Sequence, residues 1–423
     1  MKHIPYILFL FSLLLNTFTG HTQYIPEKIH QERIRTVQVR KIGDSLAPPV
    51  IHLNTAEKVK LCFDELEKEP QNYSYTLIHC DANWAASELM KHEYLYSQFE
   101  DEIPVRQNSF NTIIPYTHYE VTLPNEYIEP SISGNYTILV FKNHNPSDTV
   151  LTARFRISEA EVSVKPTIEH INRMSENKPN QKLNFSIHTG STHIQNPYNS
   201  LKIEILQNGH NRRLIEHVNP ASLNGQSLTY QNLDKLLFKG GNEFRSFNTK
   251  SKKFAGRNIE QFDFLQNQFH VRLSPDRELG YQQYKKKKEI NGQYMIDKEL
   301  TSKPELEADY MYVYFNLQDP TPDMEGGKVY VSGAFNNWKY GRENEMRYNF
   351  EEKAYQTRIL LKQGYYDYKY VMVKDGKPDE TTYSGNYYQT ENQYEIYIYF
   401  RDFSNGYDRL LGTSIYHTPV VEY

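Results

Sequence analysis

The densest group of chemically reactive side chains lies in the stretch HCDANW at residues 79–84, where His79, Cys80 and Asp81 follow one another. A metal site or a cysteine nucleophile needs side chains that converge from separate elements. Consecutive residues of a strand point to opposite faces, so His79 and Cys80 cannot act together if the stretch is extended. Two further histidines that could approach it in space are His92 and His118. We predict a strand end whose polar groups are satisfied locally.

Other signatures of catalysis are missing from the sequence. It contains no Gly-rich phosphate loop, nucleophile elbow, zinc-ligand spacing or dinucleotide fingerprint. We therefore predict a protein that is not an enzyme and that has no catalytic residue, no cofactor and no metal ion.

The two cysteines, Cys62 and Cys80, lie in the strand-like runs VKLCFDEL and YSYTLIHC, which the turn EKEPQN joins. Pairing of the two runs as a hairpin would bring the cysteines close enough to form a disulfide in an oxidising compartment. Two buried free thiols are the alternative. The expected role is structural in either case.

The residue pattern at the N-terminus is typical of an exported protein. Lys2 and His3 precede an apolar run from Ile7 to Leu15, and small polar residues follow it. This pattern is typical of a secretory signal peptide, here 1–19, with cleavage after Thr19 or Gly20. No later stretch is long and apolar enough for a spanning helix. We expect a protein of the bacterial periplasm that does not span the membrane.

Composition and charge exclude some partners. The chain has 423 residues with a net charge of −4, which becomes one unit more negative without the signal, and this is too mild to indicate nucleic acid. Basic residues gather between Lys250 and Lys288, including a run of four lysines. This segment is either a solvated hairpin face or a contact for an acidic partner.

Period-two alternation recurs along the chain, and 35 Tyr and 21 Phe favour half-buried strands. In YMYVYFNL and NQYEIYIYFR, one face is apolar and the other is largely tyrosine. An outer-membrane barrel would need continuously apolar outward faces, whereas YYDYKYVMV places Asp367 and Lys369 beside Tyr365. The pattern predicts an all-β fold of tandem β-sandwiches.

Composition and turn signals divide the chain into three expected domains. The first covers 24–158. The second covers 165–303 and contains a long irregular basic excursion at 231–263. The third covers 308–423, after the linker TSKPELEAD.

The stretch VYVSGAFNNW, followed by LLKQGYYDYKYVMVKDG, resembles the early-set immunoglobulin-like modules that include glycogen- and starch-binding domains. Such modules present a pair of exposed tryptophans to sugar, but here only Trp338 is available, with Tyr355 where a second platform would stand. Phe335 and Trp338 therefore either pack over the end of the sandwich or contact a glycan.

The ordered motifs of the whole mature chain resemble the plug protein family of the Bacteroidetes type IX secretion system. They are HCDANW, SFNTIIPYTHYEVTLPNE, SGNYTILVF, INGQY, EADYMYVYFNL, YVSGAFNNW, LLKQGYYDYKY, GNYYQTENQYEIYIYFR and YDRLLG. Ser384 departs from the pattern, because an acidic residue is expected there.

This resemblance implies a non-enzymatic periplasmic plug, a monomer when free. Its partner would be the giant outer-membrane translocon barrel, whose periplasmic mouth it closes when no substrate or shuttle subunit is bound. Candidate contacts are the basic segment 240–258 and the tyrosine faces, with Tyr397 and Tyr399. The competing hypothesis is an envelope carbohydrate-binding protein that uses Trp338.

Overall fold

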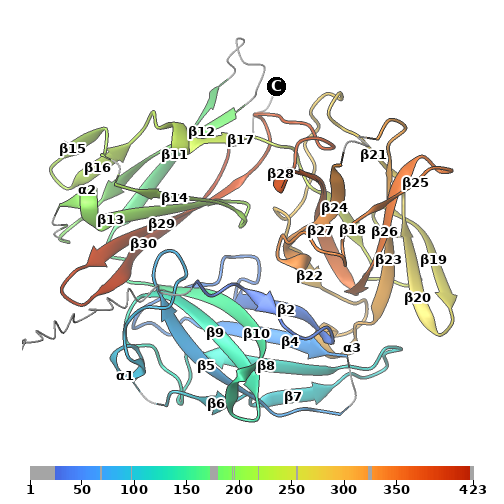
Figure 1. Cartoon of the computed structure of the whole chain (residues 1–423), viewed down its shortest axis with the longest axis horizontal. Helices are drawn as coiled ribbons and strands as arrows, with labels where there is room; N and C mark the ends of the chain where they lie inside the picture. Colours follow the sequence, from blue (N-terminus) through green and yellow to red (C-terminus); the bar gives the residue numbers. More distant parts are fainter. Residues whose placement is uncertain are drawn as a thin grey trace, which may run out of the picture.

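The computed structural model describes residues 24–419, except 67–68, 97, 172–179, 193, 195, 218, 254–255 and 323–325. The expected signal peptide lies outside the described residues. Three β-sandwiches make up the described chain (Figure 1). No helix among these residues is long and apolar enough to cross a membrane.

The first sandwich contains the strands up to β10. One sheet is formed by β1 (Lys28–Ile29), β10 (Asn145–Ser158), β9 (Gly134–Lys142), β5 (Tyr73–Cys80) and β6 (Asp101–Glu102), with β3 (Val50–His52) beside β10. The other is formed by β2 (Ile34–Lys41), β4 (Val59–Glu65), β8 (Thr117–Leu123) and β7 (Val105–Asn108). The short helix α1 (Lys91–Tyr94) lies in a connection.

Alternation explains which face of each strand enters the core. Val59, Leu61 and Phe63 of β4 are buried in the core between the sheets. The residues between them, Lys60, Cys62 and Asp64, therefore lie on the outer face of the sheet.

The second sandwich combines strands from two distant parts of the chain. One sheet holds β11 (Ser163–Ile171), β12 (Asn180–His188), β16 (Ser227–Tyr230), β15 (Ser222–Asn224) and β17 (Leu237–Lys239). The other holds β14 (Asn211–Glu216), β13 (Leu201–Gln207), β29 (Gln393–Asp402) and β30 (Tyr407–His417). The helix α2 (Pro197–Ser200) and the 3₁₀ turn η1 (Asp234–Leu236) lie in connections.

The third sandwich is inserted between β17 and β29. One sheet contains β18 (Arg245–Asn248), β27 (Gly364–Lys374), β22 (Tyr294–Ile296), β24 (Lys328–Ser332) and β28 (Lys377–Asp379). The other contains β19 (Ile259–Leu265), β20 (Gln268–Leu273), β21 (Asp276–Arg277), β23 (Tyr310–Gln318), β26 (Ala354–Lys362) and β25 (Arg347–Asn349). The helix α3 (Pro304–Glu307) precedes β23, and the turn η2 (Ala334–Asn336) follows β24.

The sheets correct the expected boundaries of the second and third domains. Residues 245–296, expected in the middle domain, pair with β23 and β27 of the third sandwich. The last two strands, expected in the third domain, complete the second sandwich, because β29 pairs with β13. The excursion at 231–263 is also less irregular than expected, since it contains η1, β17, β18 and the start of β19. Alternation identifies a strand but does not reveal its partner.

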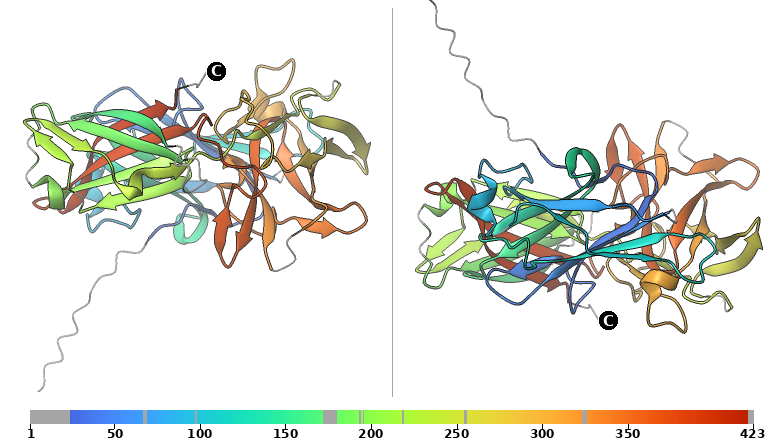
Figure 2. Two further views of the ribbon diagram at one scale, coloured as in Figure 1. Left: turned by 90° about the horizontal axis from the view of Figure 1, so that it is seen from above. Right: turned by 90° about the horizontal axis from the view of Figure 1, so that it is seen from below.

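The three sandwiches all contact one another. Seen from below, the first sandwich (blue to cyan) lies across the other two (Figure 2). A small apolar cluster joins the first sandwich to the second, and consists of Val50, Ala82, Leu206, Tyr397, Tyr399 and Leu410. Buried ion pairs also connect the first sandwich to the second and to the third.

Candidate functional site

A buried carboxylate on the outer face of β4 connects the first sandwich to the third. Oδ2 of Asp64 accepts hydrogen bonds from Nζ of Lys362 at 2.6 Å and from the hydroxyl of Tyr310 at 2.7 Å. Its Oδ1 lies 2.6 Å from Nδ1 of His118. Burial raises the pKa of Asp64, but Lys362 and His118 outweigh this effect and hold the pKa below its ordinary value.

A second buried charge cluster joins the first sandwich to the second. Nη2 of Arg156 lies 2.8 Å from Oε2 of Glu204, and Nε of Arg156 donates to the hydroxyl of Tyr399 at 3.1 Å. The guanidinium also lies 4.0 Å from the ring centroid of Tyr397. Burial raises the pKa of Glu204, yet Arg156 and Arg212 lower it further than burial raises it. Two predicted surface contacts, Tyr397 and Tyr399, are thus internal.

Trp338 lies where the second sandwich meets the third. Its ring stacks on His210 of the second sandwich, with centroids 3.7 Å apart and planes 12° apart. Phe244 packs against it edge-on at 5.8 Å, and Gly292 lies so close that a Cβ atom there would overlap the indole. His210 covers one face of Trp338 and Phe244 packs against the ring, so less of the indole is open to a glycan. The carbohydrate hypothesis is not favoured.

The other two predicted contacts of the third sandwich also serve packing. Phe335 packs against the core and meets Tyr366 edge-on, with ring centroids 5.8 Å apart. Tyr355 is buried and packs edge-on against Tyr348 at 5.0 Å. The tyrosine face of β23 is used in the same way, because Tyr310 is buried against the first sandwich.

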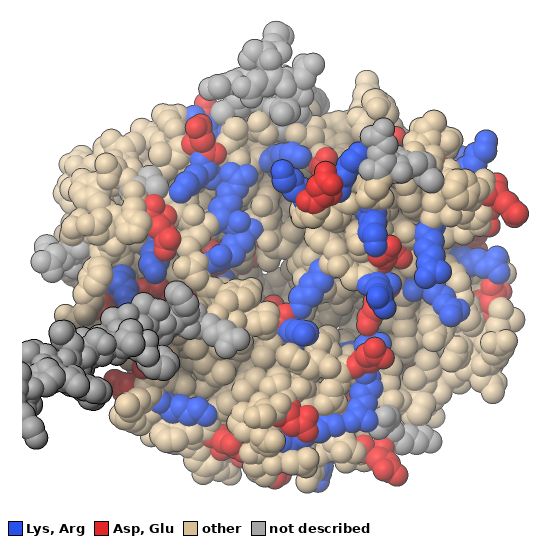
Figure 3. Space-filling view, in the orientation of Figure 1, with Lys and Arg blue, Asp and Glu red and all other residues tan. Residues whose placement is uncertain are grey.

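The basic segment 240–258 makes internal ion pairs. Lys252 lies 2.7 Å from a carboxylate oxygen of Asp309, and Lys250 lies 2.8 Å from Asp297. Two of the lysines that could have met an acidic partner are therefore paired within the chain. On the face shown in Figure 3, acidic and basic side chains are interspersed.

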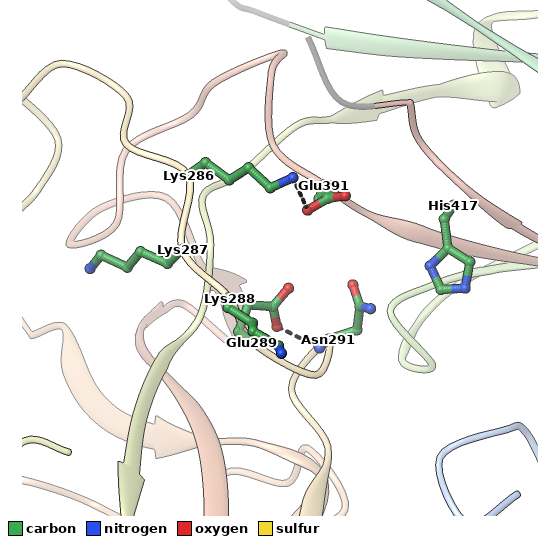
Figure 4. Close-up of a pocket in the computed structure, with 7 residues that line it drawn as sticks. All are labelled: Lys286, Lys287, Lys288, Glu289, Asn291, Glu391 and His417. Atoms are coloured by element: carbon green, nitrogen blue, oxygen red, sulfur yellow. Dashed lines mark hydrogen bonds and ion pairs between the residues drawn. The ribbon is translucent and has the colours of Figure 1, made fainter. Parts of the chain in front are cut away.

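The lysine run borders a cavity of about 400 Å³ (Figure 4). Lys286 pairs there with Glu391 at 3.3 Å. The lining residues are Lys286, Lys287, Lys288, Glu289, Asn291, Glu391 and His417. Because Glu391 lies among the lysines, the lining carries both signs of charge.

The cysteines are free and buried, which is one of the two alternatives that the sequence left open. Cys62 is on β4 and Cys80 is on β5, and these strands belong to opposite sheets and do not form a hairpin. β4 and β5 follow one another in the sequence but lie in different sheets. The open alternative of two buried thiols is the arrangement observed.

The stretch HCDANW is packed as a strand end. His79 is buried, its Nε2 lies 3.1 Å from the carbonyl oxygen of Ser133, and burial lowers its pKa to about 4. His118 does not join it, because β8 lies in the other sheet. There His118 approaches Cys62 and Glu120, with ligand atoms within 4.8 Å of one another, a grouping that the sequence did not predict.

An exposed aromatic surface lies on the first sandwich. Tyr96, Phe99 and Tyr127 are 69%, 42% and 44% exposed. Their two segments lie side by side, because the backbone N–H of Tyr96 donates to Glu129 and that of Gln98 donates to Tyr127. We call Tyr96, Phe99 and Tyr127 the aromatic edge. The sequence pattern does not indicate this surface, because neither segment alternates like a strand.

Comparison with known proteins places these features in a family. Residues 34–159 match the model of the type 9 secretion system plug protein first domain. The structure is also similar to the crystal structure of a hypothetical protein from Parabacteroides merdae ATCC 43184, with a TM-score of 0.88 and 31% identity, over 94% of this chain and 100% of that chain. The chain has no match among curated proteins. The matched residues cover β2 to β10 of the first sandwich, and the chain belongs to the family of type 9 secretion system plug proteins.

Proposed function

We propose that this protein is the periplasmic plug of the type IX secretion translocon. It closes the periplasmic mouth of the outer-membrane barrel when neither substrate nor shuttle subunit is bound. The observation that supports this function most directly is the match of the first sandwich to the plug domain. The family is one of secretion plugs and not of enzymes, and it implies association with the secretion machinery in the cell envelope.

The packing of the chain suits a protein that acts by steric exclusion. A plug must resist deformation while it fills an opening, so its parts must be held together. Buried ion pairs connect the first sandwich to the second and to the third. A stacked ring pair connects the second to the third. Each sandwich is thus held by both of the others.

Docking requires a surface that a partner can reach. The aromatic edge meets this requirement, because its three side chains are exposed and aromatic side chains supply much of the binding energy in protein interfaces. We place the contact with the barrel at this edge of the first sandwich, the same sandwich that matches the plug domain.

Co-purification tests the function. The tagged mature chain is expressed in cells that contain the translocon but lack its substrates, and outer membranes are extracted in mild detergent. We expect the giant barrel to be recovered with the chain. Its absence from the eluate, although it is present and unoccupied in the extract, would contradict the proposal.

A conductance measurement tests closure directly. Purified barrel without substrate is reconstituted in a planar bilayer, and the protein is added on the periplasmic side. Current through the barrel should fall as the plug binds and recover when it is washed out. Unchanged current at saturating protein would show that binding does not close the channel.

A further inference from the structure

The outer face of β4 and β8 carries an unusual set of side chains. The two strands are antiparallel neighbours, with Cys62 directly opposite Glu120 and Asp64 directly opposite His118. Because alternate residues share a face, all four side chains lie on the outer side of the sheet. Donor atoms of Cys62, His118 and Glu120 all lie within 4.8 Å of one another.

The donor set has a definite chemical preference. One thiol sulfur, one imidazole nitrogen and one carboxylate oxygen are the three kinds of ligand that zinc takes from proteins. Calcium and magnesium prefer oxygen ligands alone, so the sulfur and the nitrogen favour zinc over them.

His118 is oriented as a metal ligand would be. Its Nδ1 lies 2.6 Å from Oδ1 of Asp64, which fixes the orientation of the ring. Its Nε2 points toward Glu120, 3.2 Å from Oε1. A histidine that gives its second nitrogen to a carboxylate is the usual arrangement around protein-bound zinc.

The surroundings leave a way in from solvent. Cys62 and His118 are buried, whereas the side chain of Glu120 is 22% exposed. Lys60 lies 2.8 Å from Oε1 of Glu120, and its side chain is 30% exposed. A cation that binds Glu120 displaces the Lys60 ammonium into solvent. A water molecule can then bind the cation from the side of Glu120 and complete a tetrahedral set of ligands.

We propose that Cys62, His118 and Glu120 bind a zinc ion, with water as the fourth ligand and Asp64 as the positioning residue of His118. The ion adds a bond between the central strands of the sheet. It also adjoins the contact with the third sandwich, because Asp64 binds Lys362 and Tyr310 through its other oxygen. This site does not depend on the proposed plug function.

Cobalt(II) titration of the full mature chain without a histidine tag tests the site. Cobalt substitutes for zinc and gives an intense near-ultraviolet charge-transfer band only when a thiolate binds it. We expect the band to saturate at one equivalent and to disappear when zinc is added. Cys62→Ser should abolish the band, and the matched control Cys80→Ser should keep it, because Cys80 is also a buried thiol but lies in the other sheet.

Two other variants test the remaining ligands. Glu120→Gln, at the exposed rim, and His118→Gln should each weaken binding by at least the roughly 10–100-fold that changes near zinc ligands usually cause. Circular dichroism confirms that each variant is folded. Zinc should raise the midpoint of thermal unfolding of the parent but not of Cys62→Ser. No saturable binding, binding without the charge-transfer band, or a band lost in Cys80→Ser instead of Cys62→Ser would overturn the site.

Discussion

Nζ of Lys362 lies 2.6 Å from Oδ2 of Asp64, although 298 residues separate them and both side chains are only 1% exposed. The pair joins the end of β26 in the third sandwich to the outer face of β4 in the first sandwich. A buried charge is tolerated only when it is paired and hydrogen-bonded, so this contact requires the two sandwiches to stay together.

Replacement of Lys362 by Met tests this contact. The variant leaves the Asp64 carboxylate buried without its ammonium partner, which should lower the free energy of unfolding by about 3–5 kcal/mol. Urea denaturation measures the loss. The matched control is Lys328→Met, which breaks an exposed pair with Glu345 and should change stability little. Equal effects of the two substitutions would show that the buried pair does not hold the sandwiches together.

The packing around Trp338 should make an alanine substitution more costly at Gly292 than at Gly376. Gly292 has φ of +77°, and a Cβ atom there would overlap the indole of Trp338 and lie 2.7 Å from Cε1 of Phe244. Gly376 has a similar φ of +70°, with no heavy atom within 4 Å of such a Cβ. Gly376→Ala should cost about 1–2 kcal/mol from its backbone conformation alone. Gly292→Ala should cost clearly more, and similar thermal unfolding midpoints would contradict the packing described for Trp338.

The contact between Glu380 of the third sandwich and His210 of the second should depend on pH. A carboxylate oxygen of Glu380 lies 2.7 Å from Nε2 of His210. Burial raises the pKa of Glu380, but His210 and Lys369 outweigh it and lower the pKa to about 2. A carboxyl group with a lowered pKa contributes stability above its unfolded pKa, about 4.3, and loses that contribution as pH falls toward the folded value.

Glu380→Gln measures this contribution. At pH 5 the variant should be less stable than the parent by about 2 kcal/mol. The difference should shrink as pH falls from 4 to 3 in urea denaturation. Exposed Glu351 supplies the control, because Glu351→Gln should change stability little at either pH. A difference that stays constant over this range would contradict the assigned role of the charge.

Because we place the barrel contact at the aromatic edge, substitutions in this edge should weaken barrel binding. Tyr96→Ala and Tyr127→Ala should each weaken recovery of the translocon barrel by about tenfold, as loss of an aromatic anchor usually does. Because both side chains are exposed, the variants should unfold at the same temperature as the parent. Phe403→Ala is the control, because Phe403 is 73% exposed on the second sandwich. Loss of binding in the control alone would move the docking surface to the second sandwich.

Local sequence patterns predicted the all-β class and the faces of individual strands. In β29, Tyr394, Ile396 and Ile398 enter the core of the second sandwich, as their alternation indicates. Alternation reports a face because successive side chains of any strand point to opposite sides. The ordered motifs also predicted the plug protein family, which the match at residues 34–159 confirms.

Only the tertiary structure shows which strands pair and what covers the outward face of each strand. Tyr397 and Tyr399 belong to an outward face of β29, and the first sandwich covers that face. Asp64 and His118 alternate like solvated residues, yet both are buried where the sandwiches meet. Local alternation carries no information about which strand or domain will pack against a face, because these contacts join residues hundreds of positions apart.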